Sequence, residues 1–239
     1  KESSADTGKK SFIYNLLGGK NKSYLTVAAG AFVTAMLLVV AHMNWADPAI
    51  GNLQPVLDSY WLMIHVAVIV ASYGPFALGM ILGLTVLLLM IFTTEKNKAK
   101  MLLNINELTI INEMALTVGL VMLTIGNFLG GMWANESWGR YWGWDPKETW
   151  ALISIIVYAF VIHMRLIPGL RGRYGFNLAS VIAFASILFT YFGVNFYLAG
   201  LHSYQSGQQI LSYQYIAFTL VVLAIIGALT FMLIRTKKD

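Results

Sequence analysis

The sequence predicts an all-α fold, a polytopic membrane bundle of about six transmembrane helices. Of the 239 residues, 58% are hydrophobic and only 11% are charged, and the mean hydropathy is +0.67. A soluble domain of this size needs far more polar surface. Several apolar runs reach the ~20 residues that cross the hydrocarbon core of a bilayer. These runs are continuous rather than alternating, which favours helices over a β-barrel.

The predicted domain organisation is a short basic segment followed by one membrane domain. Residues 1–23 are polar and basic, as in a linker or cytoplasmic tail, and residues 24–239 form the transmembrane domain. The chain begins with Lys1 and shows no signal peptide, so we expect a piece of a longer polypeptide. It has no cysteine, which excludes disulfides, zinc thiolates and thiol nucleophiles within it. The predicted spans are residues 24–43, 61–93, 108–130, 147–165, 176–198 and 210–234.

The connecting segments alternate in charge, which predicts the orientation. All but two of the sixteen Lys and Arg residues lie in residues 1–23, 94–107, 165–174 and 235–239. The two exceptions are Arg140 and Lys147. The positive-inside rule therefore places both termini in the cytoplasm. The net charge of +5 reflects this arrangement, and it does not indicate a nucleic-acid partner.

The external segment 133–150 is unusually rich in tryptophan. Ordinary aromatic belts occupy both membrane interfaces, so interfacial anchoring alone does not explain tryptophans on one side only. Trp138 and Trp142 are four residues apart and would share a face if the segment is helical. Gly139 and Gly143 leave room for a flat ligand to stack on the indoles. All seven tryptophans are predicted on the outer side: Trp45, Trp61, Trp133, Trp138, Trp142, Trp144 and Trp150.

The charged residues of this segment have two kinds of predicted role. Arg140 and Lys147 are the only outer cations, and they could pair with the carboxylates of a ligand. A dianionic porphyrin fits this chemistry, and so does an aromatic lipid or a quinone by composition alone. Asp145, Pro146 and Glu148 have the spacing of an N-cap and capping box. A capping role for Asp145 is therefore favoured over a ligand role for its carboxylate.

The four histidines fall into different classes. His65 and His202 are predicted on the tryptophan side, where two neutral imidazoles can be axial ligands of haem iron. Either one alone can equally be a hydrogen-bonded interfacial residue. His163 lies about 27 Å further along its helix, near the inner face. It packs, snorkels with Arg165, or binds a second haem whose other ligand comes from outside this chain. His42 is read as an interfacial residue.

The residues Trp138 to Trp150, WGRYWGWDPKETW, resemble the WWD signature of haem-handling proteins. The WDPKETW ending is similar to the CcsA (ResC) branch of the system II cytochrome c biogenesis proteins. The resemblance extends over most of residues 50–235. Within it, His65 and His202 match the two external histidines of the family, and His163 matches a membrane histidine.

The resemblance implies a cytochrome c synthase of the haem-attaching lyase type. Haem b would pass a membrane site ligated by His163 and then be held outside by His65 and His202. Apocytochrome c would present its Cys-x-x-Cys-His motif there, and thioether bonds would form. The resemblance also implies a CcsB-type partner, separate or fused as in CcsBA. The expected location is the bacterial inner membrane, with the haem site facing the periplasm, or the thylakoid membrane as its equivalent. The predicted haem contacts are Trp138, Trp142, Trp144, Arg140, Lys147 and Asp145.

Three other functions compete with this interpretation. A CcmC-like protein, which loads haem onto a chaperone, shares the tryptophan motif and two outer histidines. The membrane histidine His163 and the Pro-Lys-Glu-Thr residues that begin at Pro146 argue against it. A b-type electron-transfer subunit needs histidines paired across helices inside the membrane, and only His163 is well inside a span. A transporter of a non-haem solute leaves the outer tryptophans unexplained.

Overall fold

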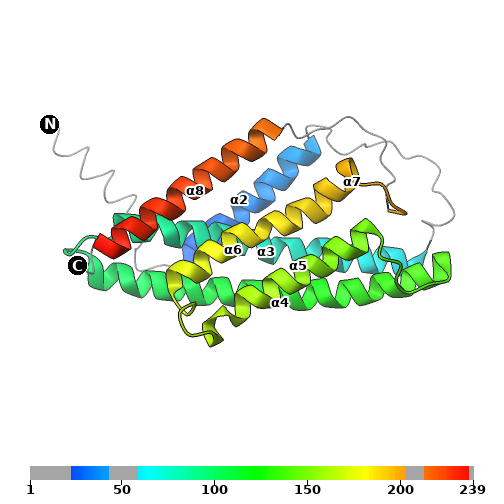
Figure 1. Cartoon of the computed structure of the whole chain (residues 1–239), viewed down its shortest axis with the longest axis horizontal. Helices are drawn as coiled ribbons and strands as arrows, with labels where there is room; N and C mark the ends of the chain where they lie inside the picture. The colour runs from blue at the N-terminus through cyan, green and yellow to red at the C-terminus, as the bar shows by residue number, and fades with distance from the viewer. Residues whose placement is uncertain (1–22, 43–58, 203–212, 237–239) are drawn as a thin grey trace.

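The computed structural model describes residues 23–42, 59–202 and 213–236, and every regular element in these ranges is helical (Figure 1). The predicted basic segment 1–23 lies outside the described residues except for Ser23. A 3₁₀ turn, Met164–Leu166, follows α5, and a π-helical turn, Phe189–Gly193, joins α6 to α7. The α-helices are α2 (Ser23–His42), α3 (Tyr60–Phe92), α4 (Lys98–Trp138), α5 (Pro146–His163), α6 (Arg173–Leu188), α7 (Val194–Tyr197) and α8 (Tyr213–Thr236).

Four helical stretches are long and apolar enough to cross a membrane. Shorter apolar stretches, Gly30–Val39 and Thr219–Ile234, lie in α2 and α8, where the first and last spans were predicted. The prediction of an all-helical polytopic membrane bundle is therefore confirmed. The four long stretches are Tyr60–Phe92, Lys98–Trp138, Pro146–Leu166 and Arg173–Tyr197.

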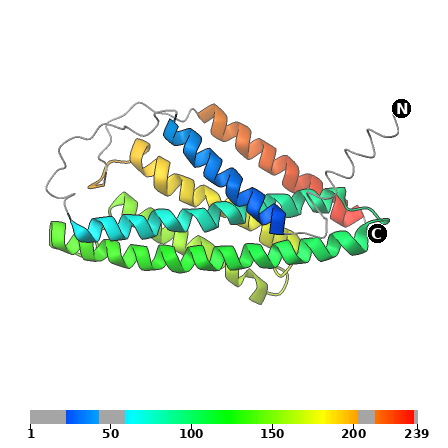
Figure 2. The ribbon, with the colours of Figure 1, turned by 180° about the vertical axis from the view of Figure 1, so that it is seen from behind.

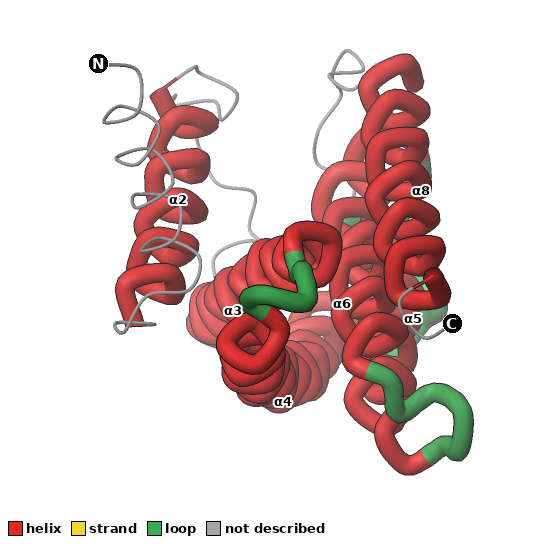
Figure 3. The backbone as a smooth tube through the Cα atoms, turned by 90° about the vertical axis from the view of Figure 1, so that its left-hand side faces the viewer, coloured by secondary structure: helices red, strands yellow, loops and turns green. Residues whose placement is uncertain are grey.

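The α3 and α4 helices form a long antiparallel hairpin at the centre of the bundle. On one side, α6 packs on α3, and α5 packs on both α6 and α4. Seen along the bundle, α2 and α8 lie at opposite edges (Figure 3). The reverse view shows α2 lying obliquely beside α3 (Figure 2). The described helices thus form one layered bundle around the α3–α4 hairpin.

The core lies where α3, α4, α5 and α6 meet. Phe76 of α3 is fully buried and its ring stacks on Tyr158 of α5, with centroids 3.9 Å apart. Gly119 of α4 lies opposite Phe76, where a Cβ would come 2.9 Å from the ring. Small residues let membrane helices approach closely. This packing fixes the helix ends that carry the candidate site.

The two ends of the bundle differ in chemistry. At one end α3 begins, α4 ends and α5 begins, and the side chains of Trp61, Trp133, Trp138, Trp142, Trp144 and Trp150 gather there; we call it the tryptophan end. At the other end, the connections 93–97 and 164–172 carry Lys96, Arg165 and Arg171; we call it the basic end. The alternation of connecting segments between two ends agrees with the predicted topology.

The third helix is longer than its predicted membrane span, residues 108–130. The helix α4 runs from Lys98 to Trp138, because its polar ends continue the backbone hydrogen bonding beyond the apolar stretch. Gly139 ends it in the left-handed conformation, with φ 71°, and donates its N–H to the carbonyl of Asn135. Trp138 is therefore the last residue of a helix, whereas Trp142 lies in the following loop. The two residues do not share a helical face, as the helical interpretation of this segment required.

Candidate functional site

A cavity of about 390 Å³ opens at the tryptophan end, between α3, α4, α5, the π-helical turn Phe189–Gly193 and α7. This volume is in the range of pockets that hold small ligands and cofactors. Apolar side chains of α3, namely Leu62, Val66, Ile69 and Val70, form one wall. Four of the residues predicted to bind a ligand also line it: His65, His202, Trp142 and Lys147.

His65 is held against α4 by a backbone contact. Its Nδ1 lies 3.0 Å from the carbonyl oxygen of Gly126, which can only accept a hydrogen bond. This contact assigns the proton to Nδ1 and leaves the Nε2 lone pair available to a ligand. Gly130, one turn later, makes the approach possible, because a Cβ there would lie 2.7 Å from the ring. The imidazole is thus oriented by the backbone of the neighbouring helix.

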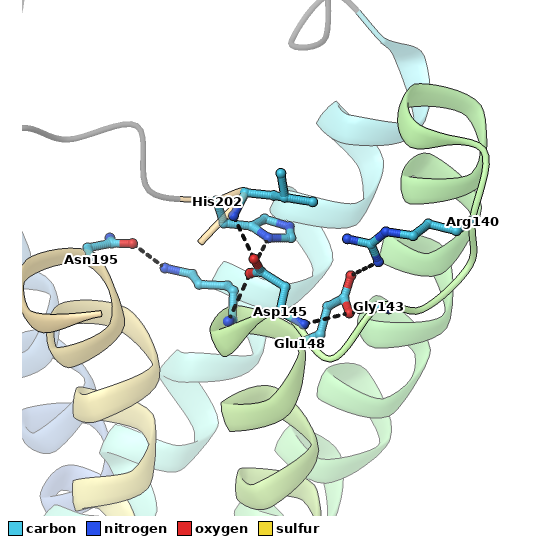
Figure 4. A network of polar contacts seen from close by, with 8 residues as sticks. Arg140, Gly143, Asp145, Glu148, Asn195 and His202 are labelled. Atoms are coloured by element: carbon cyan, nitrogen blue, oxygen red, sulfur yellow. Dashed lines mark hydrogen bonds and ion pairs between the residues drawn. The ribbon is translucent and has the colours of Figure 1, made fainter. Parts of the chain in front are cut away.

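His202 is oriented by a carboxylate. Its Nδ1 lies 2.7 Å from Oδ2 of Asp145, and the backbone N–H of Leu201 donates to Oδ1 of the same residue at 2.6 Å (Figure 4). The ring proton again belongs on Nδ1, so Nε2 carries the free lone pair. Gly200 permits this contact, since a Cβ there would lie 2.5 Å from Oδ1 of Asp145. Two histidines therefore line one cavity, each with Nε2 as the available atom.

Burial sets the protonation state of His202. It lowers the pKa of His202 below the ordinary value of 6.5, although the hydrogen bond and negative charge of Asp145 act in the opposite direction. The imidazole is therefore neutral near pH 7, which is the form that binds a metal.

Asp145 has the capping role that the sequence predicted. It accepts a hydrogen bond from the backbone N–H of Lys147, and Glu148 accepts one from the backbone N–H of Asp145, which completes a capping box at the start of α5. The prediction of this cap is confirmed. Asp145 is only 6% exposed, and its contact with His202 joins the cap to the cavity. It contacts a predicted ligand residue rather than lining the cavity itself.

Trp133 is the principal aromatic residue of the site that the sequence analysis did not select. It is 1% exposed and stacks on His65, with centroids 6.0 Å apart and an interplanar angle of 11°. It also meets His202 and Trp138 edge to face, with centroids 5.4 Å and 4.6 Å away. Trp138 contacts His202 as well, at 5.0 Å. Trp133 lies beyond the predicted end of its span, so only the extension of α4 reveals its position.

The tryptophans of the loop after α4 differ in exposure. Trp142 lines the cavity and meets Trp144 edge to face, with centroids 5.7 Å apart. Trp144 is 70% exposed and does not line the cavity, and its backbone adopts the left-handed conformation, with φ 58°. Large side chains adopt this conformation at a cost in energy. Of the tryptophans predicted to contact a ligand, Trp142 thus lines the cavity. Trp138 does not line it, but it contacts His202, which does.

Arg140 stabilises the loop rather than facing the cavity. Its guanidinium forms a 3.2 Å ion pair with Glu148 and lies 5.5 Å from the Trp138 ring centroid. Glu148 also accepts a hydrogen bond from the backbone N–H of Gly143 at 2.8 Å (Figure 4). The guanidinium fills the space over Gly143, so this glycine does not leave room for a flat ligand. The ion pair holds the loop closed against α5.

Lys147 is the basic side chain that lines the cavity. Its Nζ donates to Oδ1 of Asn195 in α7 at 2.7 Å (Figure 4). The same atom lies 5.8 Å from the ring centroid of Tyr191. Tyr191 belongs to the π-helical turn, a kind of bulge that is frequent at functional sites. Asn195 and Tyr191 carry no local signal that marks them as site residues, because their place opposite Lys147 depends on how α6 packs on α5.

His163 lies apart from the other predicted site residues. It is the last residue of α5, at the basic end, and its exposed ring contacts the carbonyl of Ala159 through Nδ1 at 2.6 Å. The neighbouring Arg165 forms a 2.5 Å ion pair with Glu113 of α4. His163 therefore does not share the cavity with His65 and His202, as the sequence predicted.

Comparisons with known proteins show the family to which the chain belongs. The profile of the family described as "Cytochrome C assembly protein" matches residues 11–202. Protein NrfI of Wolinella succinogenes is 52% identical over 185 residues, which cover 77% of this chain and 20% of that protein. "Cytochrome c biogenesis protein CcsA" of Chlamydomonas reinhardtii is 43% identical over 164 residues, which cover 68% of this chain and 44% of that protein. CcsA of Prochlorococcus marinus strain AS9601 is 36% identical over 207 residues, which cover 75% of this chain and 62% of that protein.

A helical membrane bundle with this tryptophan end and this family match defines a protein of cytochrome c biogenesis. The chain belongs to the cytochrome c assembly protein family, and two of the relatives described above are CcsA proteins. It spans between a fifth and just under two thirds of the length of the three relatives described above.

Proposed function

We propose that this chain carries haem across the membrane and presents it to apocytochrome c for thioether attachment. The observation that carries the proposal is the pair of histidines, His65 and His202, that line one apolar cavity with both Nε2 atoms available. Two neutral imidazoles on one cavity are the ligand set of a six-coordinate haem. Haem is here the substrate of the protein and not a resident cofactor.

The residues of the cavity fit the chemistry of haem b. The α3 wall supplies apolar area for the macrocycle, and Trp133, Trp138 and Trp142 supply aromatic faces and edges around the histidines. Lys147 supplies a cation to a propionate, and Asn195 orients its ammonium group. A quinone or an aromatic lipid would use the apolar wall but would leave two oriented imidazoles without a role.

The contribution of the protein is positioning. His65 and His202 fix the iron, and the aromatic residues fix the plane of the ring, so that the vinyl groups meet the cysteines of an incoming Cys-x-x-Cys-His motif. Haem supplies the reactive vinyl groups and an iron that must be reduced. The cavity itself needs no general base under this proposal, since the residues here bind and orient the reactants.

We also propose that His163 ligates haem in transit, together with a ligand from a CcsB-type partner or fused domain. His163 is exposed on the side of α5 that points away from the bundle, close to the exposed Phe160. A second polypeptide can reach it there. The proposed location is the bacterial cytoplasmic membrane with the cavity facing the periplasm, or the thylakoid membrane.

The test is haem binding by histidine variants. The chain is purified with its native partner, and the absorbance spectrum of bound haem is compared for His65→Ala, His202→Ala and the unchanged protein. We expect each variant to lose the low-spin bis-histidine spectrum and to make less holocytochrome with a co-expressed Cys-x-x-Cys-His acceptor. His42→Ala is the matched control, since His42 lies at the end of α2 and does not line the cavity. An unchanged spectrum in both cavity variants would exclude the proposed ligand role.

A further inference from the structure

The two cavity histidines are anchored by partners of different chemistry. His202 donates its Nδ1 proton to the carboxylate of Asp145 at 2.7 Å, whereas His65 donates to the neutral carbonyl of Gly126 at 3.0 Å. Both contacts select the same tautomer. They differ in what they do to the electron density on Nε2, which is the atom that would face the iron.

Asp145 is built to hold His202 firmly. Its two oxygens accept three hydrogen bonds: from Leu201 N–H to Oδ1, and from Lys147 N–H and His202 Nδ1–H to Oδ2. The carboxylate is almost fully buried at the N-terminus of α5, where the helix dipole favours its negative charge. His202 lies in the loop after α7, yet it is fixed through its ring and through the neighbouring backbone N–H. A loop position therefore does not make this histidine mobile.

A carboxylate acceptor makes an imidazole a stronger ligand. Second-shell carboxylates raise the basicity of a metal-bound histidine and fix its ring orientation, and their loss typically costs 10–100-fold in metal affinity. A backbone carbonyl orients the ring but carries no net charge, so it strengthens the ligand less. The two imidazoles in the cavity are therefore unequal donors, with His202 the stronger.

We propose that Asp145 is a positioning residue that makes His202 the retained axial ligand and leaves His65 as the ligand that the acceptor histidine replaces. This inference rests on the proposed haem function. In the exchange, the bond from His65 Nε2 to the iron breaks and a bond from the imidazole of the acceptor motif forms. All three imidazoles stay neutral and no electron is transferred. His65 keeps its Nδ1 hydrogen bond to Gly126 and can bind iron again when the next haem arrives.

The first experiment tests Asp145. Asn is as good an N-cap as Asp, so Asp145→Asn keeps a capping side chain and removes the charge. We expect haem affinity to fall about 10-fold or more and the midpoint potential of bound haem to rise, because a weaker donor stabilises ferric iron less. Glu136→Gln is the matched control: Glu136 is an exposed carboxylate at the same end, and it accepts from Ser59 rather than from a histidine. Equal affinity and potential in Asp145→Asn and the unchanged protein would overturn the proposal.

A double-mutant comparison separates positioning from general destabilisation. If Asp145 acts through His202, Asp145→Asn has no further effect on haem affinity once His202 is replaced by Ala. A purely structural loss of the cap would lower affinity by the same factor in both backgrounds, and that result would contradict the proposal. Thermal unfolding of each variant shows whether the cap itself is weakened.

The second experiment identifies the exchanged ligand. A Ser-x-x-Ser-His peptide supplies the acceptor histidine without thiols, so it reports ligand exchange alone. We expect this peptide to restore a low-spin spectrum to haem-loaded His65→Ala, in which His202 remains, and to fail with His202→Ala. The reverse pattern would overturn the inference while leaving the proposed function intact. If neither histidine variant alters the spectrum before peptide is added, the proposed function itself fails.

Discussion

Gly130 determines whether the His65 ring can lie against α4. A Cβ at this position would come 2.7 Å from both Cε1 and Nδ1 of the imidazole. Gly130→Ala should therefore push the ring out of its hydrogen bond with Gly126, and we expect haem affinity to fall on the order of 10-fold. Titration of the purified chain with haem, followed by absorbance, measures this change.

Gly30→Ala is the control for this prediction. Gly30 is also a helical glycine, on α2, but a Cβ there meets no atom within 4 Å. Both substitutions raise helix propensity, so a difference between them reports the contact with His65. Equal affinity in the two variants would show that the ring tolerates the added methyl group.

Lys147 and Arg140 should separate ligand binding from loop stability. Lys147 lines the cavity, so Lys147→Gln removes the cation that would meet a propionate. We expect it to weaken binding of haem about 10-fold but to leave binding of haem dimethyl ester, which has no carboxylates, unchanged. Parallel titrations with the two porphyrins measure the difference. Equal weakening with both would contradict a propionate role.

Arg140→Gln provides the contrasting variant. Arg140 is paired with Glu148 and fills the space over Gly143, so its loss should open the loop and lower stability by about 1–2 kcal/mol. Haem affinity should fall less than in Lys147→Gln. Thermal unfolding followed by intrinsic tryptophan fluorescence measures the loss. A haem-affinity loss in Arg140→Gln as large as that in Lys147→Gln would show that the originally predicted ligand role of Arg140 holds.

At the level of elements, the start of α5 could be predicted because its signals are local. The signals lie within four residues, Asp145, Pro146 and Glu148. Each favours the start of a helix in its own way: as the N-cap, as a proline at the first helical position, and as the acceptor of the N-cap N–H. The contact of Asp145 with His202 joins residues 57 apart. It depends on the course of the loop after α7 and on Gly200, which no local pattern reveals. The sequence therefore predicted the cap and missed its connection to the cavity.

The length of α4 was mispredicted for a related reason. An apolar window finds the part of a helix that lies in hydrocarbon, and both ends of α4 are polar. Helical hydrogen bonds continue through Asn104 and Asn135 regardless of hydropathy, and only Gly139 stops them. Trp133 was consequently placed outside a helix, although it is the ring on which His65 stacks.

The α4–α6 contact contains a buried polar junction. The amide nitrogen of Asn112 donates to Oδ1 of Asn177 and to Oγ of Ser180, both at 3.0 Å. Asn112→Ala would leave these two acceptors without that donor inside the bundle. We expect the bundle to lose about 1–2 kcal/mol of stability, measured by reversible unfolding in mixed micelles.

Thr117→Ala is the matched control for Asn112→Ala. Thr117 is exposed on the same helix, and its hydroxyl donates to the carbonyl of Glu113 within the same helix. Its loss should change stability by less than about 0.5 kcal/mol. If the two variants unfold alike, the junction does not hold α4 to α6.

For the whole molecule, composition and hydropathy predicted the helical membrane bundle, because a bilayer permits few structures and satisfies backbone groups only inside helices or barrels. They predicted that His65 and His202 lie at one end, since the count of spans assigns each connection to a side. They could not predict the cavity. Its walls come from α3, α4, α5, the π-helical turn and α7, and the contacts among these elements follow from packing rather than from any one segment.

The orientation of the bundle can be tested because the chain has no cysteine. Glu136 is exposed near the end of α4, and Lys98 is exposed at its start. We expect a membrane-impermeant maleimide to label the Glu136→Cys variant in intact cells. The Lys98→Cys variant should react only after the cells are permeabilised. The opposite labelling pattern would reverse the predicted orientation.

The length of α4 has a consequence for how a second polypeptide can reach the cavity. A helix of 41 residues is about 60 Å long, roughly twice the hydrocarbon thickness of a bilayer. With the predicted span 108–130 in the hydrocarbon, the residues after Gly130 would extend beyond it and would raise the mouth of the cavity into the water phase. An unfolded, polar polypeptide can dock there without any of its backbone groups being desolvated by lipid. Under the proposed function, haem would therefore meet a water-soluble chain at a fixed height above the membrane surface.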